Sequence, residues 1–219
     1  MMGALAFEKE TVFSNDDAIL GLKDSNKDNR GNPRVLSLLS MFLERSIQKN
    51  ERILETTQVK DAITIFHGLR APSLSIPQYI ARIFKYSCCS PSCFVIAHIY
   101  VDRFIQRTDS RITSLNIHRL LITSVMVAAK FMDDAFFNNA YYARVGGVST
   151  TEMNKLERRF LFAVDFRLYV SVQTFEKYCS ALKIEVGGVG VIERPIQACG
   201  VKDSWGNKDD SSHSRSIAR

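Results

Sequence analysis

Apolar positions recur at helical spacing along most of this chain, and no stretch shows the sustained alternation of apolar and polar residues that indicates a strand. Asn, Ser, Pro and Gly mark the ends of the expected helices, and the connections between them are short. Helices are expected over 76–86, 90–106, 115–132, 138–144 and 149–164, with one at 33–54 before them and one from 171 after them. The pattern predicts an all-α fold.

Two charges stand out against this pattern. The segment 115–132 is apolar on nearly every side, which is typical of a helix buried at the centre of a bundle, and Lys130 lies on the narrow polar stripe that remains. In the helix expected over 149–164, Glu157 falls inside the apolar face. Desolvating a charge without a partner is costly, so the two residues indicate a surface that binds another protein.

Partners within the chain are the alternative for both charges. Lys130 has Asp134 four residues later, at the spacing that brings side chains together on one face of a helix. Glu157 is followed by Arg158 and Arg159, although neighbours at one and two positions point elsewhere on a helix. From the residues alone, these local pairs are the simpler interpretation.

Composition shifts divide the chain into four parts. Residues 1–31 and 183–219 are polar or rich in Gly and Ser, and we expect them to be disordered. Residues 32–74 form an N-terminal helix, capped by its first residues, and a connector. Residues 75–182 form the central five-helix unit together with the helix that follows it.

Charge and cysteine usage limit the compartment and the partners. The chain has 29 basic and 23 acidic residues, a net charge of +6, and no basic run typical of a nucleic-acid-binding arm. Five cysteines, two of them adjacent, do not suit a disulfide framework, and no signal peptide is expected. The apolar runs are shorter than the roughly 18 residues of a membrane span. We expect an intracellular, reducing location in the nucleus and/or the cytoplasm.

No motif for catalysis or metal binding emerges. Cys88, Cys89 and Cys93 lie close together, but no matching cysteine pair follows, because Cys179 and Cys199 are distant. The histidines are separated along the chain and lack the nucleophile and orienting group of a catalytic site. We therefore expect ordinary thiols, no metal, no cofactor, no small-molecule substrate and no enzymatic activity.

An ordered set of motifs resembles the cyclin box. The motifs are Tyr-Val-Asp-Arg-Phe at 100–104, Val-Ala-Ala-Lys-Phe at 127–131 and the helix 153–162 that carries Glu157. Flanking segments resemble the plant P-type (U-type) cyclins, a group similar to the yeast phosphate-pathway cyclins, at 66–68, 70–73, 85–87, 89–91, 116–121 and 142–148. The resemblance covers roughly residues 33–185.

The resemblance implies a single cyclin box, five helices around a central helix, that binds and activates a cyclin-dependent protein kinase in cell-cycle or nutrient (phosphate) signalling. In this family, a lysine of the central helix and a glutamate of the fifth helix contact the kinase, and the matching residues here are Lys130 and Glu157. An active kinase needs its αC glutamate paired with the ATP-binding lysine, and a surface that holds αC inward favours that conformer.

The resemblance assigns Tyr100, Asp102, Arg103 and Phe104 to the structure of the box. The arginine that usually pairs with the aspartate is missing, which leaves Arg82 as a candidate partner of Asp102. Many cyclins carry a Met-Arg-Ala-Ile-Leu motif on the first box helix, where it is linked to substrate docking. The helix expected at 76–86 lacks this motif, so the resemblance does not imply docking through a hydrophobic patch. There is no room for a second box.

A second interpretation is a cyclin-like fold that binds nucleic acid or transcription factors, as in general transcription factor IIB. Two tandem boxes and a basic surface favour that class, and binding to DNA would then depend steeply on salt. The chain shows one box, so a kinase catalytic subunit is the expected partner and nucleic acid is the alternative.

Overall fold

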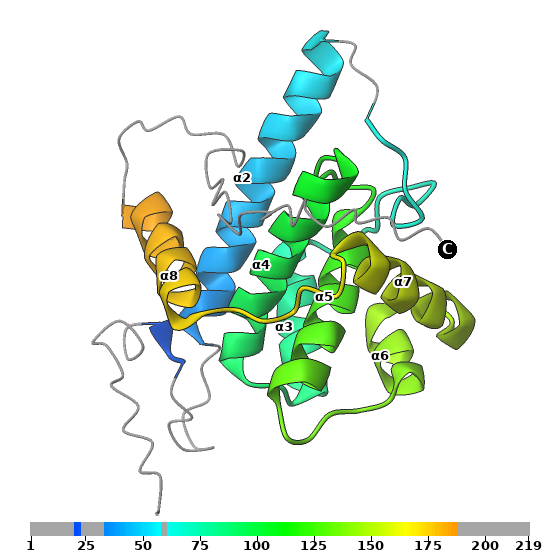
Figure 1. Cartoon of the computed structure of the whole chain (residues 1–219). Coiled ribbons are helices and arrows are strands. Elements are labelled where there is room, and N and C mark those ends of the chain that lie inside the picture. The colour runs from blue at the N-terminus through cyan, green and yellow to red at the C-terminus, as the bar shows by residue number, and fades with distance from the viewer. Residues whose placement is uncertain (1–19, 23–32, 58–60, 188–219) are drawn as a thin grey trace, which may run out of the picture.

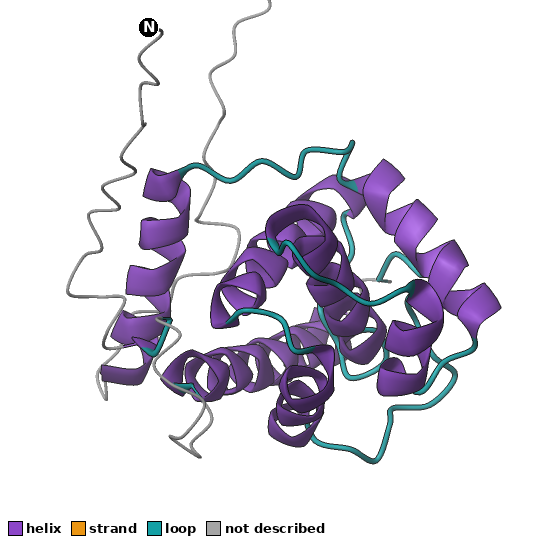
Figure 2. Ribbon diagram, turned by 90° about the horizontal axis from the view of Figure 1, so that it is seen from below, coloured by secondary structure: helices purple, strands orange, loops and turns teal. Residues whose placement is uncertain are grey.

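The computed structural model describes residues 20–22, 33–57 and 61–187, and the regular elements in these ranges are all helices (Figure 2). They are α2 (Arg34–Thr57), α3 (Ile76–Ser87), α4 (Pro91–Thr108), α5 (Ile117–Met132), α6 (Asn139–Gly146), α7 (Thr150–Ala163) and α8 (Val172–Gly187). The all-α prediction is confirmed. The five predicted box helices are α3 to α7, flanked by α2 and α8.

Helix α5 forms the centre of the bundle (Figure 1). It packs against α3, α4, α6 and α7, and every residue from Leu120 to Ala129 is buried. Neighbours on all sides explain why its sequence is apolar around nearly the whole circumference. Within the described ranges, no helix is both long enough and apolar enough to cross a membrane.

Polar side chains begin the box helices much as predicted. At the start of α3, Ser75 accepts the Gln78 N–H and the Gln78 side chain accepts the Ser75 N–H, which completes a capping box. The sequence Ser149-Thr150-Thr151-Glu152 predicts a second capping box at the start of α7, but only half of it forms. The Ser149 hydroxyl accepts the Glu152 N–H at 3.1 Å, but the Glu152 carboxylate binds Arg119 of α5 instead.

Helix α2 packs along α3, α4 and α8. Most of its predicted apolar face is buried, namely Val35, Leu36, Leu39, Leu43 and Ile47. Leu54 is only half-buried, because the last turns of α2 extend past the rest of the bundle (Figure 1). The predicted packing role of this helix therefore holds over its first four turns.

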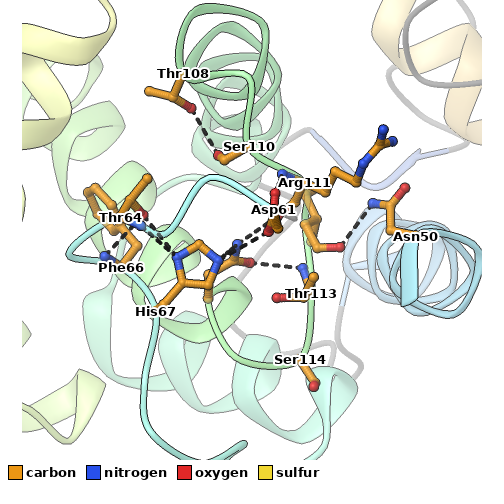
Figure 3. Close-up of polar contacts among 12 residues, drawn as sticks. Asn50, Asp61, Thr64, Phe66, His67, Thr108, Ser110, Arg111, Thr113 and Ser114 are labelled. Atoms are coloured by element: carbon orange, nitrogen blue, oxygen red, sulfur yellow. Dashed lines mark hydrogen bonds and ion pairs between the residues drawn. The ribbon is translucent and has the colours of Figure 1, made fainter. Parts of the chain in front are cut away.

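The connector after α2 is tied to the loop between α4 and α5 by polar contacts (Figure 3). Asp61 accepts the Arg111 N–H at 2.9 Å, and its other carboxylate oxygen lies 3.3 Å from His67 Nε2. The backbone N–H of Thr64 donates to His67 Nδ1 at 3.0 Å. His67 therefore holds this turn together.

Two described stretches lie inside the regions predicted to be disordered. Leu20, within 1–31, is fully buried in the core. Helix α8, which packs on α2 and α4, continues to Gly187, although the tail was predicted from residue 183. The remainder of both predicted tails lies outside the described residues.

Candidate partner-binding site

The predicted box residues Tyr100 and Arg103 hold the linker that crosses from α7 to α8 (Figure 1). The buried Tyr100 hydroxyl donates to the Leu168 carbonyl at 2.6 Å, and burial raises the pKa of this tyrosine. Arg103 donates to the carbonyls of Arg167 at 2.5 Å and Tyr169 at 3.0 Å. Both side chains leave α4 on the side where the linker passes, so they fix the position of α8.

Asp102 of the same motif is buried and binds α8. Its Oδ2 accepts the Tyr178 hydroxyl at 2.5 Å and the Gln106 amide at 3.0 Å. Burial nevertheless raises the pKa of Asp102, because the hydrogen bonds offset only part of the desolvation. The predicted Arg82 partner is wrong: Arg82 lies on the α3 side that faces α6, where it donates to the Arg144 carbonyl at 3.2 Å.

Phe104 completes the motif in the core. Its ring is stacked on Phe160 of α7 with centroids 5.5 Å apart, and it contacts the edge of Phe66 at 4.9 Å. The four residues that the resemblance assigned to the box therefore connect α4 to α7, to α8 and to the connector.

Lys130 and Glu157 bind each other at the junction of three helices. Lys130 Nζ donates to Glu157 Oε1 at 2.6 Å and to Asn139 Oδ1 at 2.5 Å. The Asn139 amide donates to Glu157 Oε2 at 2.6 Å and to Asn154 at 2.8 Å. We call Lys130, Asn139 and Glu157 the charge cluster. Asn139 was missed from the sequence, because a polar residue in the first turn of a helix resembles a cap.

The local pairs considered as alternatives are wrong. Helix α5 ends before Asp133, whose backbone is extended at φ −92° and ψ 142°, so Asp134 is no longer one helical turn from Lys130. Arg158 and Arg159 are exposed, and within the described residues neither forms an ion pair with the neighbouring glutamate. The two charges that stood out separately in the sequence therefore form one pair in the structure.

The charge cluster keeps unused hydrogen-bonding capacity at the surface. The side chains of Lys130 and Glu157 are 27% and 19% exposed. An ammonium group has three donors and a carboxylate about four acceptor sites, and within the described part of the chain each group uses two. A partner that reaches this position can therefore bind both charges without first breaking the pair.

Large apolar side chains follow Lys130 directly. Phe131 and Met132 at the end of α5, and Phe136 and Phe137 in the loop to α6, are all exposed. We call these four residues the apolar rim. A contiguous patch of exposed apolar residues marks a protein-binding surface more often than single exposed residues do.

A second ion pair joins the same two helices elsewhere. Arg119 Nε donates to Glu152 Oε1 at 2.7 Å, with side chains 28% and 36% exposed. Among the residues that the structure describes, no third side chain joins this pair as Asn139 joins the other, and the guanidinium lies against the connector at Gly68. It therefore provides an internal reference for the charge cluster.

Comparison with known proteins identifies the family of the chain. The family model described as "Cyclin" matches residues 25–168. Cyclin-P3-1 of Oryza sativa subsp. japonica is 55% identical over 200 residues, which cover 90% of this chain and 84% of the rice protein. Cyclin-U3-1 of Arabidopsis thaliana is 47% identical over 221 residues, which cover 100% of both chains. Cyclin-U4-1 of the same plant is 47% identical over 193 residues, which cover 84% of this chain and 94% of the relative. The chain therefore belongs to the cyclin family of regulatory proteins and is similar to its plant P- and U-type members.

Proposed function

We propose that this cyclin binds and activates the catalytic subunit of a cyclin-dependent protein serine/threonine kinase. The observation that carries the proposal is the charge cluster with its unused donors and acceptors beside the apolar rim. Such a surface combines an apolar contact area with polar groups that fix orientation. The proposal is also supported by membership in the cyclin family and by the match of Lys130 and Glu157 to the kinase-contacting positions.

The mechanism proposed for activation is selection of the active kinase conformer. A kinase is active when its αC glutamate pairs with the ATP-binding lysine, so a partner that holds αC inward raises the population of that state. The surface suits this role because it is held rigidly: α5, which carries Lys130, is buried along most of its length. The charge cluster also links α5, α6 and α7, so little order has to be gained on binding.

The test is reconstitution with purified kinase catalytic subunits. We expect no phosphotransfer by the chain alone and a clear rise in phosphorylation of a generic peptide when the cognate kinase is present. Lys130→Ala and Glu157→Ala should each weaken binding by at least about 2 kcal/mol, roughly 30-fold, because each leaves a partly desolvated charge without its partner.

Arg119→Ala and Glu152→Ala are the controls, because they remove the other ion pair between the same helices, in which the basic residue is equally exposed and the glutamate more exposed. Both should keep kinase affinity within about 1 kcal/mol of the wild type. Wild-type affinity in the two charge-cluster variants, with circular dichroism melts unchanged, would refute the proposed surface. Intrinsic phosphotransfer by the chain, free of contaminating kinase, would refute the regulatory role.

We propose further that the complex acts in cell-cycle control or nutrient (phosphate) signalling, in the nucleus and/or the cytoplasm. The likeness to plant P- and U-type cyclins supports a cyclin role, and the five cysteines, which do not suit a disulfide framework, support a reducing compartment. A pull-down from nuclear and cytoplasmic extracts of dividing and of phosphate-starved cells, read for a kinase catalytic subunit, distinguishes the two roles. Recovery of no kinase from any of the extracts would count against both.

A further inference from the structure

Two thiols and a carboxylate meet where α4 begins and α5 ends. Cys89 directly precedes the N-cap Ser90 and Cys93 lies in the first turn of α4, where its side chain tilts toward the N-terminus of the helix. Both thiols therefore lie at the start of α4. Asp133 follows the last residue of α5. One ligand atom from each of the three residues lies within 4.8 Å of the others, and both cysteines are buried.

These distances fit a tetrahedral metal ion. Ion–ligand distances of about 2.3 Å to sulfur and about 2.0 Å to oxygen place neighbouring ligand atoms roughly 3.5 to 3.8 Å apart. The Cys93 Sγ to Asp133 Oδ2 distance is 3.4 Å. The longest separation in the group is at most 4.8 Å, so a shortening of up to about 1 Å would bring all three atoms to bonding distance of one ion.

The residues around the three groups hold them in place. The Ser90 N–H donates to Asp133 Oδ2 at 3.1 Å and the Ser90 hydroxyl to Oδ1 at 3.0 Å. The Ser87 hydroxyl lies 3.0 Å from Cys89 Sγ. The Cys93 thiol also donates to Asp133 Oδ2, and this third hydrogen bond is lost when the thiol gives up its proton to bind an ion. The two contacts from Ser90 would remain and orient the carboxylate, which keeps lone pairs for a metal.

An unpartnered hydroxyl lies in the neighbourhood of these three groups. Tyr142 is fully buried, and within the described residues its hydroxyl has no hydrogen-bond partner. Burial raises the pKa of this tyrosine, and the negative charges of Cys89, Cys93 and Asp133 raise it further, so the hydroxyl lies within electrostatic reach of all three groups. An ion, or a water bound to it, would supply the missing partner.

We propose that Cys89, Cys93 and Asp133 bind a thiophilic divalent cation of the Zn²⁺ class, with Tyr142 facing the fourth position. Binding joins the ion to two thiolates and one carboxylate and releases the two thiol protons to solvent. The ion would link the start of α4 to the end of α5, beside the apolar rim. The cysteines alone could not show this, because the third ligand is 40 residues from Cys93 in the sequence.

Metal titration of the reduced, metal-free full chain tests the proposal. Co²⁺ should bind one ion per chain and give the thiolate-to-cobalt charge-transfer band of a sulfur-ligated site. Zn²⁺ should displace it, remove the band and raise the melting temperature. Micromolar Co²⁺ and Zn²⁺ that produce neither the band nor a change in melting would overturn the proposal.

Variants assign the ligands. Cys93→Ser and Asp133→Asn should each weaken Zn²⁺ binding by at least about 100-fold, and Tyr142→Phe by about 10-fold, as expected for an outer partner. Asp133 is partly exposed, so Asp133→Asn is expected to fold. It tests the site even if Cys93→Ser, which changes a buried residue, fails to fold. Cys88→Ser and Cys179→Ser are controls, because neither thiol belongs to the cluster. One-to-one binding that survives in Asp133→Asn, or that is lost in Cys88→Ser, would contradict the assignment.

Discussion

Polar groups on the two sides of the bundle differ in what surrounds them. Between α4 and α8, His98 and Asp102 are buried, and Tyr178 of the same chain contacts both. The charge cluster between α5, α6 and α7 is partly exposed and retains free hydrogen-bonding capacity beside the apolar rim. The first arrangement ties folding to the protonation of buried groups, whereas the second leaves charges available to a partner. We therefore expect changes at the first site to alter stability and changes at the second to alter binding.

The largest effect is expected on the buried side, as a loss of stability in acid. Burial lowers the pKa of His98 from 6.5 to about 4. The unfolded chain then binds a proton that the folded chain does not bind between these two values, so stability falls as the pH drops from 6.5 toward 4. The full window is worth roughly 3 kcal/mol. Urea unfolding at pH 7.5, 5 and 4 measures this loss.

His98→Leu provides the comparison for that measurement, because it removes the titrating group and keeps an apolar side chain against Phe42 and Tyr178. Between pH 7.5 and 4, the free energy of unfolding should fall less in the variant than in the wild type, and the difference should be most of the roughly 3 kcal/mol. Burial raises the pKa of Asp102, and this shift increases stability as the pH falls. It is present in the variant and in the wild type, so it cancels in their comparison. An equal loss of stability in variant and wild type would show that His98 does not control the acid response.

The second prediction is that Lys130 and Glu157 are coupled in binding more than in folding. The double alanine variant should lose less kinase affinity than the sum of the single losses of about 2 kcal/mol each, because both charges serve one contact set. Coupling in the free energy of unfolding should stay below about 1 kcal/mol, since the pair is partly exposed. The measurement is a double-mutant cycle of kinase affinity and of urea unfolding.

Strong coupling in unfolding and none in binding would reverse the comparison, because the charge cluster would then resemble the buried side of the bundle.

Asn139→Ala extends the cycle to the third member of the charge cluster. Its amide holds Glu157 at 2.6 Å, so its loss should weaken kinase binding through a misplaced carboxylate.

The third prediction concerns the apolar rim. Phe136 is 53% exposed, so Phe136→Ser should leave stability within about 0.5 kcal/mol of the wild type. It should weaken kinase binding about tenfold, roughly 1.4 kcal/mol, by removing an aromatic contact from the interface. Leu69→Ser is the control, because Leu69 is an exposed apolar residue of the connector. Equal affinities of the two variants would remove the rim from the proposed interface.

The helices could be predicted from the sequence because their signals are local. Ser75 and Asn138 cap helices where the pattern placed them, and the apolar circumference of α5 was sufficient to predict its central position. Half of the Ser149 capping box failed because Arg119, from another helix, competes for Glu152. This contact depends on how α5 packs against α7, and a local sequence pattern carries no information about that packing.

The candidate site was predictable only in part. Periodicity identified Lys130 and Glu157 as charges in apolar surroundings, but their pairing depends on where α5 crosses α7. The role of Asn139 depends on the same crossing. The approach of Asp133 to the cysteines depends on how α4 packs on α5, and it places a carboxylate 3.4 Å from a buried thiol across 40 residues of sequence.

The smallest effect is expected at the reference ion pair, and Gly68→Ala tests it without removing a charge. A Cβ at this position would lie 2.7 Å from Arg119 Nη1 and 3.2 Å from the Arg70 carbonyl oxygen. The guanidinium is the mobile end of a long side chain, so it should move and lengthen its 2.7 Å contact with Glu152. We expect a loss of about 1 kcal/mol or less in unfolding free energy, since exposed ion pairs contribute little, and no change in kinase affinity.

Thermal melts and kinase titration of Gly68→Ala, Arg119→Ala and the double variant measure this small effect. If the alanine acts through the guanidinium, it should cost nothing further once Arg119 has been removed. An unchanged cost in the double variant would assign the strain to the Arg70 carbonyl instead. A tenfold loss of kinase affinity with an unchanged melting temperature would place the Arg119–Glu152 pair in the interface. The contrast between the two ion pairs of α5 and α7 would then no longer hold, and the partner surface would extend along both helices.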